Sequence, residues 1–236
     1  MLENQSLNRD ESVVKSGIVN AFMRGVYYWM TAGLLVTAAV SWFAANSYAF
    51  MKLSYENRMV PIVLAVGVFG LSIYLNARIH KLSAGAATGL FLLFSGLMGL
   101  LLAPIFIVYT QSSIFTTFLV CAGMFGGMSV YGLVTKRDLT GWRSFLVMGV
   151  IGLLILMIVN IFTYSGTLNL LIGFLGVIIF AGLTAYDSQK LKQMGMSAPT
   201  NDPTALRRGT ILGALTLYLD FINLFLMLLR IIGDRR

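Results

Sequence analysis

Hydrophobic residues occur along the chain in seven long runs that short polar segments separate. The runs cover residues 26–46, 59–77, 84–108, 113–134, 144–164, 168–187 and 209–232. Each is close to the ~20 predominantly apolar residues that a helix needs to cross the hydrocarbon core of a bilayer. The pattern predicts an all-α membrane protein, built as a bundle of seven transmembrane helices.

The segments outside the runs are short, so they leave no room for a second folded domain. Residues 1–25 are polar and contain three acids, unlike the short basic start of a cleaved signal peptide. We therefore predict a polar cytoplasmic N-terminal tail over residues 1–25, a transmembrane domain over 26–232 and a basic C-terminal tail over 233–236.

Composition supports a membrane protein and disfavours the soluble classes. Of the 236 residues, 58% are hydrophobic and 11% are charged, against about 45–50% and about 25% in average globular proteins. So few charges cannot cover a soluble domain, which argues against a soluble enzyme and a nucleic-acid-binding domain. The net charge of +8 indicates basic residues retained on one membrane face, with lipid and not nucleic acid as the partner.

The distribution of lysine and arginine predicts the orientation. The N-terminus and the loops after spans two, four and six carry 12 basic residues, and the opposite side carries 5. Loops rich in Lys and Arg remain in the cytoplasm, so we expect the N-terminus there. Seven spans then place the C-terminus outside, yet Arg230, Arg235 and Arg236 lie at that end. The sequence leaves open whether the last segment crosses fully.

Nucleophilic and metal-binding side chains are scarce. Cys121 is the single cysteine and lies in an apolar run, and His80 is the single histidine. One cysteine cannot form an intramolecular disulfide or a multi-thiolate metal site, and one histidine disfavours zinc sites and catalytic triads. We expect no catalytic residues and no cofactor.

Two acidic residues fall inside the runs and are the strongest functional signal. Asp187 ends the sixth run, and Asp220 lies in the middle of the seventh. An ionisable group in a span costs at least ~2.5–3.5 kcal/mol on insertion scales, so it marks a functional site by default. Two carboxylates within hydrogen-bonding range cannot both ionise easily, so the pair would share a proton.

The two acids differ in depth. Asp187 is three residues, or ~4–5 Å, from Lys190, whereas Asp220 is 12 residues, or ~18 Å, beyond Arg208. They meet only if the seventh helix begins above the membrane surface or the sixth tilts inward. The Asp–Pro pair at residues 202–203 is a good helix start and favours the first option.

The seventh run also carries small and polar residues at steps of three or four. They are Gly209, Gly213, Thr216, Asp220 and Asn223. This spacing is one face of an α-helix, which we expect to face the bundle interior or a water-filled cavity. Thr216 and Asn223 are therefore candidates for an ion path. The alternative is that they only hydrogen-bond to neighbouring helices.

Two further charged residues are candidates for the same path. Arg78 ends the second run on the predicted cytoplasmic side and is the candidate latch on one aspartate. Its alternative role is an anchor whose side chain reaches the membrane surface. Glu56, in an outer loop, would attract cations to an external mouth, or is an ordinary loop acid.

These segments resemble the Bax inhibitor-1, or transmembrane Bax-inhibitor-motif, family. The resemblance rests on Ala185-Tyr-Asp-Ser-Gln189 and Leu217-Tyr-Leu-Asp-Phe-Ile-Asn-Leu-Phe225, and Ala103-Pro-Ile-Phe106 is similar to the bacterial branch. It implies six helices around a central seventh. It also implies a pH-sensitive passive calcium leak, gated by an acid pair, in the bacterial cytoplasmic (inner) membrane.

The resemblance assigns roles to four residues. Asp187 and Asp220 match the family's acids by motif, which implies that they sense pH and bind Ca²⁺ transiently. Glu56 and Arg78 match only by approximate location, as an acid at the mouth and a latch. A tight Ca²⁺ site needs about 6–8 oxygen ligands, more than this constellation offers, so Ca²⁺ is expected as the transported ion.

One other function stays open, and a third is disfavoured by the motifs. A non-conducting regulator would bind a membrane-bound protease or another membrane protein, with the N-terminal tail as a candidate contact. An intramembrane aspartyl protease would also pair two aspartates on adjacent helices. Such enzymes carry glycine close before the second aspartate, where this chain has Tyr218 and Leu219, and a later Pro-Ala-Leu motif, whereas no proline follows Pro203.

Overall fold

Helices account for almost the whole chain. The computed structural model describes the backbone of residues 2–197 and 202–236, with side chains from residue 17 onward in those ranges. The helices are α1 (Leu2–Asn46), α2 (Tyr48–Glu56), α3 (Met59–Arg78), the 3-10 turn η1 (Ile79–Lys81), α4 (Ala84–Leu102), α5 (Ile105–Val108), α6 (Gln111–Val134), α7 (Trp142–Thr163), α8 (Gly166–Met196) and α9 (Pro203–Ile232). The described residues contain no β-strand beyond one isolated bridge, so the all-α class is confirmed.

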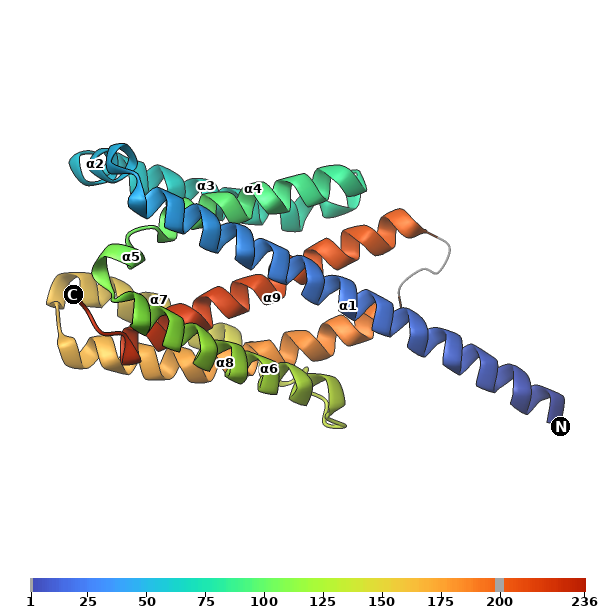
Figure 1. Cartoon of the computed structure of the whole chain (residues 1–236). Helices are drawn as coiled ribbons and strands as arrows, with labels where there is room; N and C mark the ends of the chain where they lie inside the picture. The colour runs from blue at the N-terminus through green and yellow to red at the C-terminus, as the bar shows by residue number, and fades with distance from the viewer. Residues whose placement is uncertain (1, 198–201) are drawn as a thin grey trace.

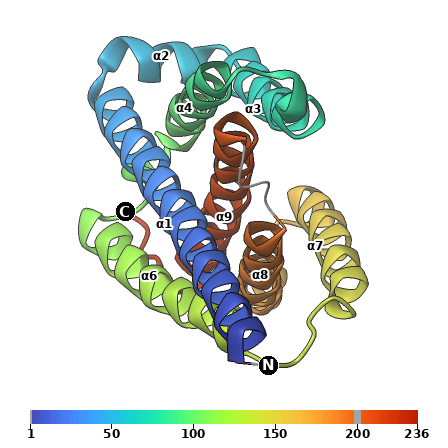
Figure 2. The same ribbon diagram turned by 90° about the vertical axis from the view of Figure 1, so that its right-hand side faces the viewer.

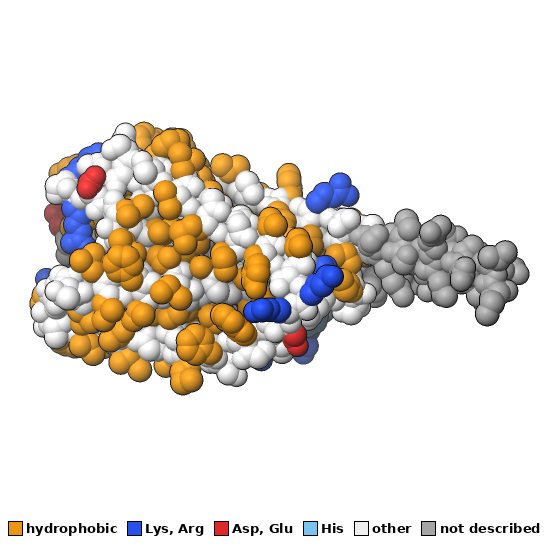
Figure 3. All heavy atoms as spheres, turned by 90° about the horizontal axis from the view of Figure 1, so that it is seen from below, with side chains coloured by type: hydrophobic (Ala, Val, Ile, Leu, Met, Phe, Trp, Pro, Cys, Tyr) orange, Lys and Arg blue, Asp and Glu red, His pale blue; other side chains and the backbone are white. Residues whose placement is uncertain are grey.

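Seven helical segments are long and apolar enough to cross a membrane, as predicted. They are Gly17–Asn46, Met59–Lys81, Ala84–Val108, Gln111–Val134, Trp142–Thr163, Gly166–Met196 and Pro203–Ile232. Figure 3 shows hydrophobic side chains over the flank of the bundle, with lysine and arginine toward its two ends. This is the surface expected of a protein whose flanks contact lipid.

The buried part of α1 extends to residues before 26, the predicted start of the first run. Val19, Phe22 and Met23 are all buried. Phe22 packs at Gly195 of α8 and Gly209 of α9. The apolar run alone does not reveal this turn, because polar residues interrupt the buried ones.

The last helix, α9, lies at the centre of the bundle. Figure 2 shows it enclosed by the surrounding helices, and it packs against α1, α4, α6 and α8. Of its apolar stretch, 67% is buried, against 11% in each of the spans of α3 and α7. The central seventh helix that the resemblance implies is therefore confirmed, with α3 and α7 at the periphery.

α9 (Pro203–Ile232) extends from one end of the bundle to the other, so the last apolar segment runs the full length of the bundle. The chain termini lie at opposite ends (Figure 1). The tail after α9 is tied to the connection between α5 and α6. The Thr110 N–H donates to the Asp234 carbonyl at 3.0 Å, the Arg236 N–H donates to the Val108 carbonyl at 2.9 Å, and the Asp234 N–H donates to Ser113 Oγ at 2.8 Å.

Candidate functional site

The structure brings the two predicted acids together between α8 and α9. Asp220 is only 6% exposed, and Asp187 is partly buried. Their carboxyl groups lie within hydrogen-bonding reach, so one can donate to the other when it carries a proton. Oδ2 of Asp220 is buried and has no other hydrogen-bond partner among the described residues. Because an unpaired buried charge is costly, this arrangement favours a proton held between the two groups.

The early start of α9 contributes to this meeting. α9 begins at Pro203, 17 residues before Asp220, which corresponds to ~26 Å of helix. Asp202 caps it by accepting hydrogen bonds from the Thr204 and Ala205 N–H groups, each at 2.9 Å. The predicted helix start at residues 202–203 is confirmed. α8 also continues beyond Asp187, as far as Met196.

A close approach of α6 and α8 fixes the backbone beside Asp187. A Cβ atom on Gly132 of α6 would overlap the carbonyl oxygen of Ala185 on α8. Glycine is therefore the residue that lets the two backbones touch here. Ala185 lies two residues before Asp187, so this contact holds the helical turn of α8 that carries Asp187 against α6.

A chain of hydroxyl groups lies next to the pair and was missed by sequence reasoning. Ser188 Oγ on α8 bonds Ser129 Oγ on α6 at 2.7 Å, and Ser129 Oγ in turn bonds the Tyr27 hydroxyl on α1. These bonds join three helices at the position that follows Asp187. The one available signal was Ser188 itself, within the motif that ends the sixth run.

Opposite the acid pair, α9 is held by a second polar contact. The Tyr218 hydroxyl bonds Thr37 Oγ1 of α1 at 2.6 Å, and Thr37 donates to the Ser95 carbonyl of α4 at 2.9 Å. Phe91 and Phe94 contact the Tyr218 ring edge to face, with centroids 5.9 and 5.7 Å away. These contacts fix the rotation of α9 about its own axis and so aim Asp220.

The cations near the pair are not the predicted one. Lys190 on α8 and Arg143 on α7 lie close enough to act on the charge of Asp187. Arg78 is exposed at the end of α3, which packs on α4 at the periphery, and it makes no ion pair within the described chain. The structure therefore does not bring Arg78 to the acid pair.

The other predicted path residues lie apart from one another. Thr216, one turn before Asp220, is partly buried and donates to the Leu212 carbonyl of its own helix at 3.0 Å. Asn223, one turn after it, is also partly buried. Glu56 is exposed at the end of α2, where it pairs with Lys52 at 3.9 Å, at the same end of the bundle as the C-terminus (Figure 1).

The end of α8 is tied to the loop between α6 and α7. Gln189 accepts a hydrogen bond from the Leu139 N–H and donates to the Arg137 carbonyl, both at 2.8 Å. In this loop the Thr140 hydroxyl and the Thr140 N–H, the latter at 2.8 Å, interact with the Asp138 carboxylate, and these two contacts hold the pKa of Asp138 below its ordinary value. Asp138 is exposed and lies between the spans of α6 and α7.

The oxygen groups at the pair are few. Among the side chains of residues 17–197 and 202–236, no three from His, Cys, Asp or Glu gather to hold a metal ion. Two carboxylates fall short of the about 6–8 oxygens of a tight Ca²⁺ site. The pair alone therefore does not provide the ligands of a tight Ca²⁺ site.

Comparison with known proteins shows the family. The model for "Inhibitor of apoptosis-promoting Bax1" matches residues 19–236. The chain is 54% identical over 230 residues to "Inner membrane protein YbhL" of Escherichia coli strain K12, covering 97% of this chain and 98% of that protein. It is 43% identical over 219 residues to an uncharacterised protein of Borreliella burgdorferi, covering 93% and 94%. The chain therefore belongs to the Bax inhibitor-1 family of integral membrane proteins.

Proposed function

We propose that the protein is a pH-sensitive passive calcium leak of a bacterial inner membrane, gated by Asp187 and Asp220. The observation that carries this proposal is the buried acid pair between the central helix and α8. An acid pair of this kind changes charge with pH at the core of the bundle, which an ordinary structural contact between helices does not require.

The pair couples pH to two properties at once. Loss of the shared proton adds negative charge, which attracts a divalent cation. It also makes the two carboxylates repel each other, which weakens the contact between α8 and α9. Protonation reverses both effects. Lys190 and Arg143 lie near enough to moderate the charge of Asp187. The pair therefore links the cation's path to the packing of the central helix.

The test is calcium flux into liposomes that contain the purified protein and a trapped calcium dye. Wild-type flux should change with pH, and Asp187→Asn and Asp220→Asn should each flatten that dependence. The double variant should add little, because both changes remove the same titrating unit. Asp138→Asn is the matched control, since Asp138 is an acid on the surface loop; it should keep the wild-type profile.

A second candidate is a non-conducting regulator of a membrane-bound protease or another membrane protein. It is favoured by α1, whose helix begins at Leu2 in the polar N-terminal segment, so a helical segment is available for contact. Flux equal to that of protein-free liposomes at every pH would reject the leak and favour this regulator. Strictly additive effects of the two Asp→Asn changes would reject the pair as one unit.

A further inference from the structure

A groove runs along the flank of the bundle between α1 and α6. It consists of two cavities of about 380 and about 430 Å³, which share Leu34, Ala38, Phe118 and Phe221 and so lie end to end. α1 and α6 each pack on α9 but hardly on one another, and Figure 2 shows them diverging. Phe221 of α9 lies in both cavities. We call this feature the α1–α6 groove.

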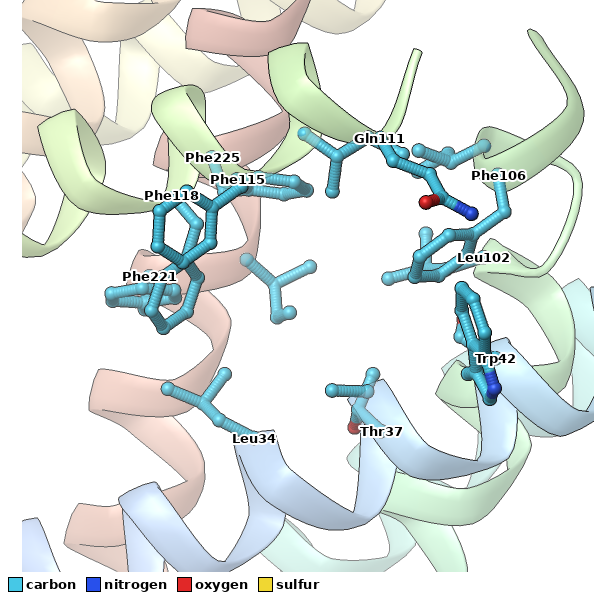
Figure 4. Close-up of a pocket in the computed structure, with 15 residues that line it drawn as sticks. Leu34, Thr37, Trp42, Leu102, Phe106, Gln111, Phe115, Phe118, Phe221 and Phe225 are labelled. Atoms are coloured by element: carbon cyan, nitrogen blue, oxygen red, sulfur yellow. The ribbon is translucent and has the colours of Figure 1, made fainter. Parts of the chain in front are cut away.

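The groove is apolar, and its wall on α1 lies within the first apolar run, residues 26–46. Figure 4 shows the first cavity, where Phe115, Phe118 and Phe225 face Leu34 across the opening. Along α1 this cavity extends from Leu34 to Trp42, about 12 Å of helix, close to the ~15 Å that is half of a bilayer's hydrocarbon core. An empty apolar groove forfeits dispersion contacts, so the acyl chains around it will fill it.

A polar group lines the end of the groove near the C-terminus, and two arginines belong to the neighbouring tail. The Gln111 amide points into the cavity beside Phe106 (Figure 4). The Arg235 guanidinium lies 5.9 Å from the centre of the Tyr109 ring, two residues from Gln111. The Arg236 backbone is bonded to Val108 in the same segment. A hydrogen-bond donor and two arginines at a membrane surface are groups that a lipid phosphate binds.

We propose that the α1–α6 groove binds a phospholipid of the bilayer. One acyl chain lies between α1 and α6 on Phe221, and the phosphate faces Gln111 and the two C-terminal arginines. The lining is almost entirely apolar, with the Gln111 amide at one end, which fits a ligand with a long apolar chain and one polar end. Neither aspartate lines the groove, although its second cavity reaches Tyr27 and Ser129 of the hydroxyl chain.

The test uses a phospholipid with a photoreactive diazirine in the middle of one acyl chain. The full-length protein is reconstituted in phosphatidylcholine and phosphatidylglycerol vesicles that contain a small share of this probe. It is then irradiated, digested and mapped by mass spectrometry. Cross-links should concentrate on groove residues of α1, α6 and α9, and the outward faces of α3 and α7 should carry fewer.

A pair of neighbouring alanines supplies the matched variants. Ala38 lines both cavities, whereas Ala39 is exposed and lines neither. Ala38→Trp fills the groove and should lower groove cross-linking about tenfold, while Ala39→Trp should leave it unchanged. If Ala38→Trp fails to fold, Ala122→Phe fills the second cavity from the α6 side.

Three results would overturn the proposal. The first is equal groove labelling in the filled and control variants. The second is labelling spread evenly over every outward face, which would mean bulk lipid only. The third is a cross-linked dimer at these residues, which would assign the groove to a second copy of the chain. Reduced labelling in an Arg235→Gln, Arg236→Gln double variant, at the same total incorporation of probe, would support the position of the phosphate.

Discussion

At the scale of single residues, the hydroxyl chain next to the acid pair is a sensitive contact. Ser188→Ala removes the bond to Ser129 and leaves a buried hydroxyl with one partner fewer. We expect a loss of about 1–2 kcal/mol in unfolding free energy, measured as a lower melting temperature in detergent. Tyr27→Phe combined with Ser188→Ala should cost less than the sum, because both changes break the same chain.

Ser112→Ala is the control for this prediction, since Ser112 Oγ bonds Thr110 at an exposed position. Its effect should stay within about 0.5 kcal/mol. Equal melting temperatures for Ser188→Ala and Ser112→Ala would show that the chain of hydroxyl groups contributes nothing to stability.

The close approach at Gly132 gives a second prediction at this scale. Gly132→Ala places a methyl group against the Ala185 carbonyl, so α6 and α8 must separate. Such overpacking costs about 1–3 kcal/mol and should also alter the pH profile of flux, because Asp187 follows two residues later. Gly123→Ala, on the same helix, meets nothing within 4 Å and should be neutral or slightly stabilising. Identical melting curves for the two variants would contradict the close contact.

At the scale of elements, the sequence predicts those features that depend on a single helix. Run length alone predicted the seven spans, because a bilayer sets the number of apolar residues. The start of α9 was predicted because Asp202 caps its own helix, a local interaction. Asp220 was predicted as a functional residue because an ionisable side chain in a transmembrane run is costly and is seldom kept for packing alone.

Contacts between residues on different helices could not be predicted from the sequence. Arg78 and Arg143 are both basic residues at the edges of spans, and only the three-dimensional packing shows that Arg143 is near Asp187 while α3 carries Arg78 to the periphery. The bond between Ser129 and Ser188 joins residues 59 positions apart. No periodicity in a single chain identifies such pairs. The buried turn at Val19–Met23 was missed for a related reason: its partners are on α8 and α9.

At the scale of the whole molecule, the two termini lie at opposite ends of the bundle. The distribution of Lys and Arg predicts that the N-terminal end faces the cytoplasm. Variants with one added cysteine, labelled in spheroplasts with a membrane-impermeant maleimide, test this. Arg236→Cys should label in intact spheroplasts, and Lys136→Cys should label only after lysis. The native Cys121 is fully buried and serves as the unlabelled background.

The reverse labelling pattern would invert the predicted orientation and place Glu56 on the cytoplasmic side. Labelling of both positions from the same side would contradict a full crossing by α9. The hydrogen bonds between the C-terminal tail and residues 108–113 make the second outcome incompatible with this fold.

α9 is at once the core of the bundle and the last of the seven spans to be synthesised. The six spans before it enter the bilayer before their contacts with α9 can form. Thr37 then lacks its hydrogen-bond partner Tyr218, and Asp187 lacks its partner Asp220. The native arrangement must therefore form after synthesis, when the last helix moves into a ring that is still open. A chain interrupted before residue 203 would leave an unfilled centre within the membrane, a recognisable signal for quality-control proteolysis.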